Sequence, residues 1–204
     1  MNTYCEYMSH ATRDGNDEAR NMFQHAIDLD PSYAPAYAAL GLSLIEAVGS
    51  GWTEFVADAL DRAETLGQKA LSLDPASTVA YRLLAQVDVM RGRFDLALSQ
   101  VDRALEINPS DAESYMVRGN VLVWAGRSAE ALPWLEGALR FDRANTRTSL
   151  LLGMAYSKLC AAEQATGRRT RADDGDAHVA VSRRRAVSPD NSARKMPATT
   201  CSKG

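Results

Sequence analysis

The chain has 204 residues, of which 46% are hydrophobic and 7% aromatic, and its formal net charge is −3. This length suits one ordinary domain or a short array of repeats with a sizeable core, and no apolar run is long enough to span a membrane. Residues 1–166 carry 14 Lys/Arg against 22 Asp/Glu. Because a phosphate backbone selects for a basic surface, we expect no nucleic-acid binding.

The first predicted element is a helix over residues 15–29, GNDEARNMFQHAIDL, whose apolar residues recur at helical spacing. Residues 1–14 form a frayed segment that is too short to supply a complete helix before it. Pro31 blocks continuation of the helix, because proline lacks the N–H that a helix interior uses. Residues 15–33 therefore indicate the second half of a two-helix unit.

The next unit, residues 34–77, is ten residues longer than the units that follow it. Glycines flank a serine at 49–51, and we expect the first helix of this unit to break there. The extra residues predict a lengthened second helix that is N-capped by Thr53 and ends at Leu73.

Residues 78–111 and 112–145 repeat with a period of 34 residues, and ALSLDPASTVAY recurs as ALEINPSDAESY. Small residues at fixed offsets let paired helices approach closely, and a glycine stands where each first helix must stop. The recurring positions that define the repeat along the chain are Ala19, Ala26, Pro31, Tyr37, Gly41, Ala63, Ala70, Pro75, Tyr81, Ala85, Gly92, Ala97, Ala104, Pro109, Tyr115, Gly119, Gly126, Ala131, Ala138 and Gly153.

The last unit, residues 146–166, contains one good first helix, TSLLLGMAYSKL, with a short continuation to Ala165. From residue 167 onward the chain carries 9 Lys/Arg against 4 Asp/Glu and loses helical periodicity, which predicts a disordered basic tail over 167–204. Two origins fit this tail: an out-of-frame reading of a GC-rich gene, or a genuine basic extension. In either case the last helix lacks its usual cover, so we expect this uncapped repeat to self-associate or to dock on another segment.

The segment TVAYRLLAQVDVMRGRFDLALSQVDRALEINP resembles the tetratricopeptide repeat family, whose pattern is W/Y-x2-L-G-x2-Y, then A-x3-F, then A and P. The resemblance covers residues 15–166 and implies an all-α fold, an α-solenoid of stacked antiparallel helix pairs wound into a superhelix. The first helices of the pairs would line a concave groove that commonly binds peptides or proteins. The long unit over 34–77 also resembles repeat arrays attached to bacterial class III adenylate cyclases and to winged-helix transcriptional regulators.

One face of each first helix is expected to line this groove. We expect Arg82 and Asn120 to make directional hydrogen bonds and Trp124 to anchor a partner; the alternative for each residue is an ordinary solvated helix face. The full predicted set is Leu42, Glu46, Arg82, Gln86, Met90, Met116, Asn120, Trp124, Leu150, Met154 and Lys158.

Motifs for catalysis, metal binding and cofactor binding are absent from the sequence. The histidines His10, His25 and His178 are too dispersed for a triad or a ligand set, and no phosphate-binding loop or nucleophile motif occurs. We therefore predict a non-enzymatic interaction scaffold with a protein or peptide partner and with no cofactor, metal, nucleic acid or membrane. The alternative is a regulatory or sensory fragment of a signalling protein, a cyclase or a winged-helix regulator, whose effector domain is absent here.

Two further expectations concern location and one unusual residue. The N-terminus lacks the positive start and apolar core of a signal peptide, and three scattered cysteines form no disulfide framework, so a cytoplasmic bacterial protein is expected. Asp88 stands where the repeat favours a packing residue. A buried carboxylate needs a partner, and we expect Arg91 or Arg118 to supply it.

Overall fold

The computed structural model describes residues 12–165. Within them the chain forms only helices, and the all-α prediction is confirmed. The predictions for residues 1–11 and for the tail from residue 167 lie outside the described residues. The eight helices are α2 (Arg13–Leu29), α3 (Ala34–Gly49), α4 (Val56–Leu73), α5 (Thr78–Met90), α6 (Phe94–Ile107), α7 (Ala112–Trp124), α8 (Ser128–Phe141) and α9 (Thr146–Ala165).

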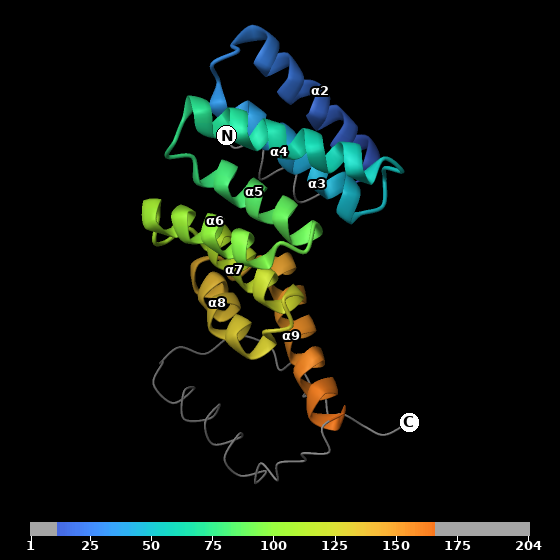
Figure 1. The fold of residues 1–204 in the computed structure, drawn as a ribbon, viewed down its shortest axis with the longest axis vertical. Coiled ribbons are helices and arrows are strands. Elements are labelled where there is room, and N and C mark those ends of the chain that lie inside the picture. Colours follow the sequence, from blue (N-terminus) through green and yellow to red (C-terminus); the bar gives the residue numbers. More distant parts are fainter. Residues whose placement is uncertain (1–11, 166–204) are drawn as a thin grey trace. The chain divides into compact units, whose positions relative to one another are not determined.

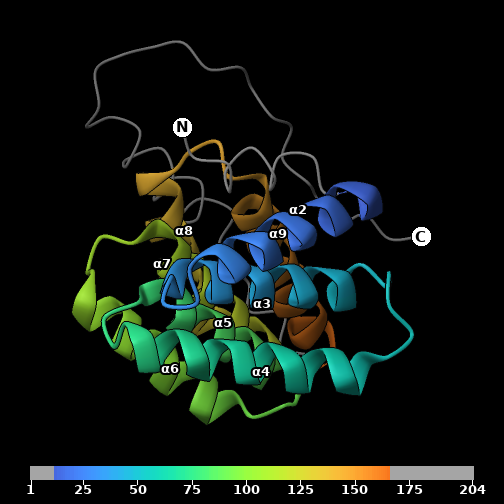
Figure 2. The same ribbon diagram turned by 90° about the horizontal axis from the view of Figure 1, so that it is seen from above.

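Consecutive helices pack as antiparallel pairs, α3 with α4, α5 with α6 and α7 with α8, and the pairs stack in chain order (Figure 1). The first helices α3, α5 and α7 also contact one another from pair to pair. Seen along the stack, α4 and α6 lie along one side of the array, below α3 and α5 in the view (Figure 2). Each pair buries its apolar stripe against its neighbours, which is how a solenoid forms one continuous core.

The first helices end in the same way in three units. Gly51, Gly92 and Gly126 follow α3, α5 and α7 with φ values of 68°, 71° and 77°, a left-handed conformation that suits glycine. The residue after each glycine donates its backbone N–H to a carbonyl in the last helical turn, which closes a Schellman motif. These bonds, each 2.8 Å long, run from Trp52 to Ala47, from Arg93 to Asp88 and from Arg127 to Leu122.

Replacing Gly92 with alanine should lower the free energy of unfolding by about 1–2 kcal/mol, the cost of a left-handed conformation for a residue with a Cβ. A Cβ at Gly92 would meet no atom within 4 Å, so the effect isolates the backbone. Gly153 is the matched control, because a Cβ there also meets nothing within 4 Å but the residue is helical. Gly153→Ala should be neutral or stabilising in the same urea titrations, and equal losses for both variants would contradict this account.

The longer second unit matches its prediction in the end of α3 at Gly49 and in the long α4 that ends at Leu73, and differs from it at the start of α4. Helix α4 begins at Val56 and its N-cap residue is Phe55, so the prediction of Thr53 as the N-cap is wrong. Thr53 Oγ1 instead accepts the backbone N–H of Phe55 at 3.2 Å, a bond within the turn before the helix. The extra residues also lengthen α3, which has 16 residues against 13 in α5.

Small residues of the repeat lie at the closest approaches between helices. The seam alanines of α4, α6 and α8 are buried, and Gly119 on α7 faces Leu135 on α8 so closely that a Cβ would lie 2.4 Å from the leucine Cδ2. Leu135 belongs to the largest core cluster, together with Val101, Val117 and Val121. The interior is therefore close-packed at this pair, and a side-chain change on either helix is felt by the other.

Candidate protein-binding groove

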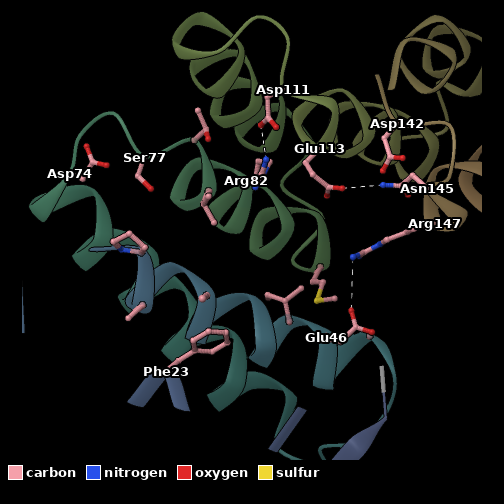
Figure 3. A pocket seen from close by; sticks show the side chains of 18 of the residues that line it. Phe23, Glu46, Asp74, Ser77, Arg82, Asp111, Glu113, Asp142, Asn145 and Arg147 are labelled. Atoms are coloured by element: carbon pink, nitrogen blue, oxygen red, sulfur yellow. Dashed lines mark hydrogen bonds and ion pairs between the residues drawn. The ribbon is translucent and has the colours of Figure 1, made fainter. Parts of the chain in front are cut away.

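One groove runs along the array and is lined by residues of all five predicted units. Its walls are parts of α2, α3, α5 and α9, the start of α7, and the turns before α5, α7 and α9; we call it the inner groove (Figure 3). Its volume is about 1310 Å³. This exceeds the roughly 300–1,000 Å³ of typical small-molecule pockets, so the groove has room for a polypeptide segment.

Two ion pairs cross between the helices that line the inner groove. Arg82 on α5 donates to Asp111 at 2.6 Å, and only 7% of Arg82 is exposed. Asp111 also accepts from Ser114 Oγ at 2.6 Å, so this pair links α5 to the first turn of α7. Arg147 at the start of α9 lies 3.9 Å from Glu46 near the end of α3, so this pair bridges the second unit and the last (Figure 3).

The predicted groove residues divide into several environments. Glu46, Arg82, Met90 and Leu150 line the inner groove. Met116 is 2% exposed and belongs to the core, so a partner cannot reach it without a rearrangement. The other predicted residues also lie outside the lining. Leu42 and Gln86 are buried, Asn120 is half-buried on α7, and Met154 packs against the core. The last two are Trp124 and Lys158.

Trp124 and Lys158 lie together at the ends of α7 and α9. Lys158 Nζ donates to the backbone carbonyl of Val123 at 2.9 Å and lies 5.1 Å from the centre of the Trp124 ring. Trp124 is 53% exposed. The lysine therefore caps the carbonyl end of α7 and attracts the tryptophan ring. Trp124 remains accessible, but it lies outside the groove lining.

The lining residues that the predicted set lacks include several acidic side chains in or next to the turns between units. Asp74, Asp111, Glu113 and Asp142 all line the inner groove, and they lie before or at the start of α5, α7 and α9. Glu113 accepts from Asn145 Nδ2 at 3.1 Å across the turn between the last two units. A sequence signal exists for part of this set, because Asp30 and Asp74 both directly precede the repeat proline, and Asp142 stands at the same position in the later unit.

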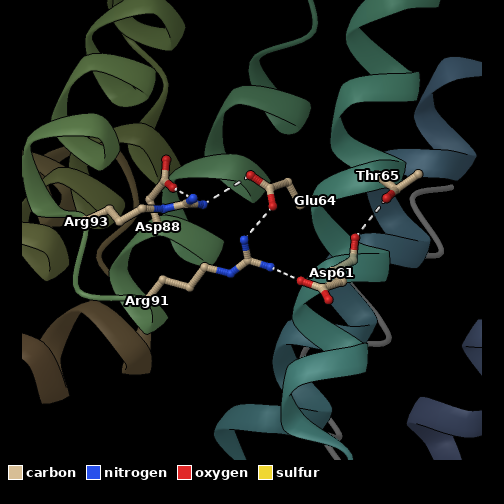
Figure 4. Close-up of polar contacts among 6 residues, drawn as sticks. All are labelled: Asp61, Glu64, Thr65, Asp88, Arg91 and Arg93. Carbon is tan, nitrogen blue, oxygen red and sulfur yellow. Dashed lines mark hydrogen bonds and ion pairs between the residues drawn. The ribbon is translucent and has the colours of Figure 1, made fainter.

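Asp88 pairs with a different arginine from those predicted. Its carboxylate lies 2.6 Å from Arg93, whereas Arg91 pairs with Asp61 and Glu64 on α4 (Figure 4). Arg93 also donates to Glu64 at 3.1 Å, so one network joins α4, α5 and the turn after α5. Burial raises the pKa of the Asp88 carboxyl above its ordinary value, and the nearby Arg93 opposes that rise.

Arg118, the other predicted partner of Asp88, belongs to an aromatic cluster between α7 and α8. Its guanidinium lies 4.2 Å from the centre of the Trp134 ring and forms an ion pair with Asp102 on α6. Burial lowers the pKa of Arg118 from its ordinary value. Tyr115 packs against Trp134 and Phe141 at ring-centre distances of 5.3 and 5.4 Å, so this cluster joins three helices.

In the part of the chain that the structure describes, no group of three or more His, Cys, Asp or Glu side chains is placed to hold a metal ion. Over the same residues, no helix combines the length and apolar character needed to cross a bilayer.

Comparison with known proteins identifies the repeat. The family model of the tetratricopeptide repeat matches residues 57–121, which span α4 to α7. TTC0263, a thermophilic TPR protein of Thermus thermophilus, has a similar structure with a TM-score of 0.57 and 19% identity, covering 85% of this chain and 91% of that one. MamA gives a TM-score of 0.50 with 20% identity, covering 82% of this chain and 90% of that one. No curated protein matches the chain. Residues 57–121 therefore belong to the tetratricopeptide repeat family, and the described array has its fold.

Proposed function

We propose that this chain is a non-enzymatic scaffold whose inner groove binds an extended segment of a partner protein. The observation that carries the proposal is the groove, with a volume of about 1310 Å³ and walls from every predicted unit. A peptide several residues long fits such a surface better than a small molecule does. The packed helices hold the walls in place before a partner arrives, which reduces the ordering cost of binding.

The residue assignments within this proposal follow from accessibility. Glu46, Met90 and Leu150 offer polar and apolar contacts to a partner in the groove, and Trp124 offers an exposed ring outside the lining. Arg82 is proposed as a positioning residue, because its guanidinium is buried and already paired with Asp111. Its replacement would disturb the start of α7, so it is a poor reporter of binding.

Blocking the groove should weaken binding without unfolding the array. Thr146 is exposed at the start of α9 and lines the inner groove, so Thr146→Trp places a large ring in the path of a bound segment. Thr65→Trp is the matched control on α4, where the residue is exposed and lies outside the groove lining. The probe is an unbiased displayed library of random peptides, selected on the full chain and measured by fluorescence anisotropy as synthetic peptides.

Peptides selected on the wild-type chain should bind Thr65→Trp normally and Thr146→Trp at least about tenfold more weakly, which corresponds to about 1.4 kcal/mol. Circular dichroism should show the same helical content for both variants. Failure to select any peptide, or equal affinity for both variants, would count against the groove. The alternative function, a regulatory fragment of a signalling protein, was suggested by the long unit over 34–77. It stays a prediction.

A further inference from the structure

The charges that line the inner groove do not balance. Its arginines are Arg82 and Arg147, and each already has a carboxylate partner, Asp111 at 2.6 Å and Glu46 at 3.9 Å. Both pairs are drawn in Figure 3, where each guanidinium points at its carboxylate rather than into open space. Both positive charges of the lining are therefore already paired with carboxylates of the array.

Three further carboxylates of the lining, Asp74, Glu113 and Asp142, have no ion-pair partner among residues 12–165. They accept hydrogen bonds only from backbone N–H groups or from the side-chain amide of Asn145. These donors are neutral, so the negative charge of each carboxylate remains. The three side chains lie in or next to three successive turns between units, and they place uncompensated negative charge along the groove.

A second observation concerns the amide of Gln86. This residue is only 9% exposed, yet its side chain forms no hydrogen bond with any residue of the described array. Gln86 lies four residues after Arg82 and four before Met90, and both of these line the inner groove, so all three share one face of α5. Among residues 12–165, Gln86 is not one of the residues whose buried side-chain atoms lack a hydrogen-bond partner, so its amide reaches solvent. It lies outside the groove lining but on the same helix face, where it has both donors and an acceptor to offer a ligand.

Asn120 is the matching residue on the first helix of the next unit. It is half-buried on α7, 34 residues after Gln86, and its amide is likewise unpaired within the described residues. Glu113 lies seven residues before it on the same helix, a separation of about 10 Å at the helical rise. An extended peptide spans that distance with about three residues. One bound segment can thus reach both the amide and the carboxylate.

We propose that the inner groove selects an extended peptide that carries lysine or arginine side chains. The amides of Gln86 and Asn120 bond the peptide backbone, whose N–H and C=O groups are free in an extended segment. The cationic side chains lie beside Asp74, Glu113 and Asp142 and supply the charge that the groove lacks. This inference rests on the proposed function, because it names the chemistry of the partner in the same groove.

The test uses the random-peptide library selected on the full chain. Peptides that bind wild type and lose affinity with Thr146→Trp should be rich in Lys and Arg. In the tightest of them, changing the basic residues to Gln should weaken binding about tenfold, since several partly exposed ion pairs act together, and changing them to Glu should weaken it further. Raising the salt concentration should narrow the difference between the basic peptide and its Gln version.

Variants of the chain separate the two parts of the proposal. Glu113→Gln with Asp142→Asn removes two groove charges and should reduce the preference for the basic peptide over its Gln version. Asp58→Asn with Asp95→Asn is the charge-matched control on exposed residues of α4 and α6 outside the groove lining, and it should keep the preference. Gln86→Ala with Asn120→Ala should weaken the basic peptide and its Gln version by similar factors.

The outcomes distinguish this inference from the proposed function. Selected peptides that bind in the groove but are acidic or uncharged would overturn the inference and leave the proposed function standing. Loss of the preference in the control variant as well would place the charge effect outside the groove, which also overturns the inference. If no peptide is selected at all, the proposed function fails and the inference fails with it.

Discussion

Replacing Leu135 with alanine should lower the free energy of unfolding by about 2–5 kcal/mol. Leu135 is 0% exposed and belongs to the core cluster that joins α6, α7, α8 and α9. Its removal costs the buried apolar surface and also leaves a cavity that the surrounding helices fill only in part. Urea unfolding followed by circular dichroism measures the change.

The cavity argument has its own test in the facing glycine. A Cβ on Gly119 would lie 2.4 Å from Cδ2 and 2.5 Å from Cγ of Leu135, so Gly119→Ala alone should destabilise by about 1–3 kcal/mol through overpacking. In the double variant the new methyl group enters space that Leu135→Ala vacates. The loss of stability in the double variant should therefore be smaller than the sum of the two single losses by about 1 kcal/mol. Leu96→Ala on the exposed face of α6 is the control and should change stability by less than about 0.5 kcal/mol. Strict additivity would mean that the two helices are less tightly packed than the structure has them.

Much of the fold could be predicted because the same helix-pair pattern recurs several times in the sequence. Ala97 and Ala104 are buried at the seam of α6, and Gly92 ends α5 in the left-handed conformation that its position after a first helix indicates. These positions have local causes, namely a close helix approach and a helix end. Local causes leave a periodic signal in the sequence, so the helix pairs follow from spacing alone.

The features that sequence reasoning missed depend on the path of the backbone after a turn. Several arginines lie near Asp88 in the sequence or within one unit of it, and spacing alone does not rank them. The turn at Gly92 folds Arg93 back, so that its backbone N–H bonds the Asp88 carbonyl at 2.8 Å and its side chain meets the Asp88 carboxylate. The pair of Glu46 with Arg147 likewise arises from the curvature of the array, which no local pattern encodes.

Replacing Arg93 with alanine should destabilise the array by about 2–3 kcal/mol, because it leaves a buried carboxylate without its partner. Asp88 is 5% exposed, and its carboxylate lies 2.6 Å from Arg93 (Figure 4). The arginine itself is partly exposed, which places the expected loss below that for a fully buried pair. Glu64 keeps Arg91 as a partner in this variant, so the main defect is the charge on Asp88.

Neutralising Asp88 should therefore rescue much of that loss. Asp88→Asn has nearly the same shape without the charge, so the double variant with Arg93→Ala should be more stable than Arg93→Ala alone, whereas Asp88→Asn in the wild-type chain should be neutral or destabilising. A double variant less stable than Arg93→Ala would show that the charge of Asp88 is not the cause.

Protonation gives an independent measure of the same cost. Burial raises the pKa of Asp88 above that of an unfolded aspartate, near 3.9, so the native state takes up the proton first as the pH falls. The part of the stability that depends on Asp88 is thus lost as pH rises through these pKa values and recovered as pH falls. Lowering the pH from 7 towards 4 should narrow the stability gap between Arg93→Ala and its double variant with Asp88→Asn, because only the former carries the titrating carboxyl. A gap that stays constant over this range would show that the loss in Arg93→Ala comes from packing of the arginine stem and not from an unpaired charge.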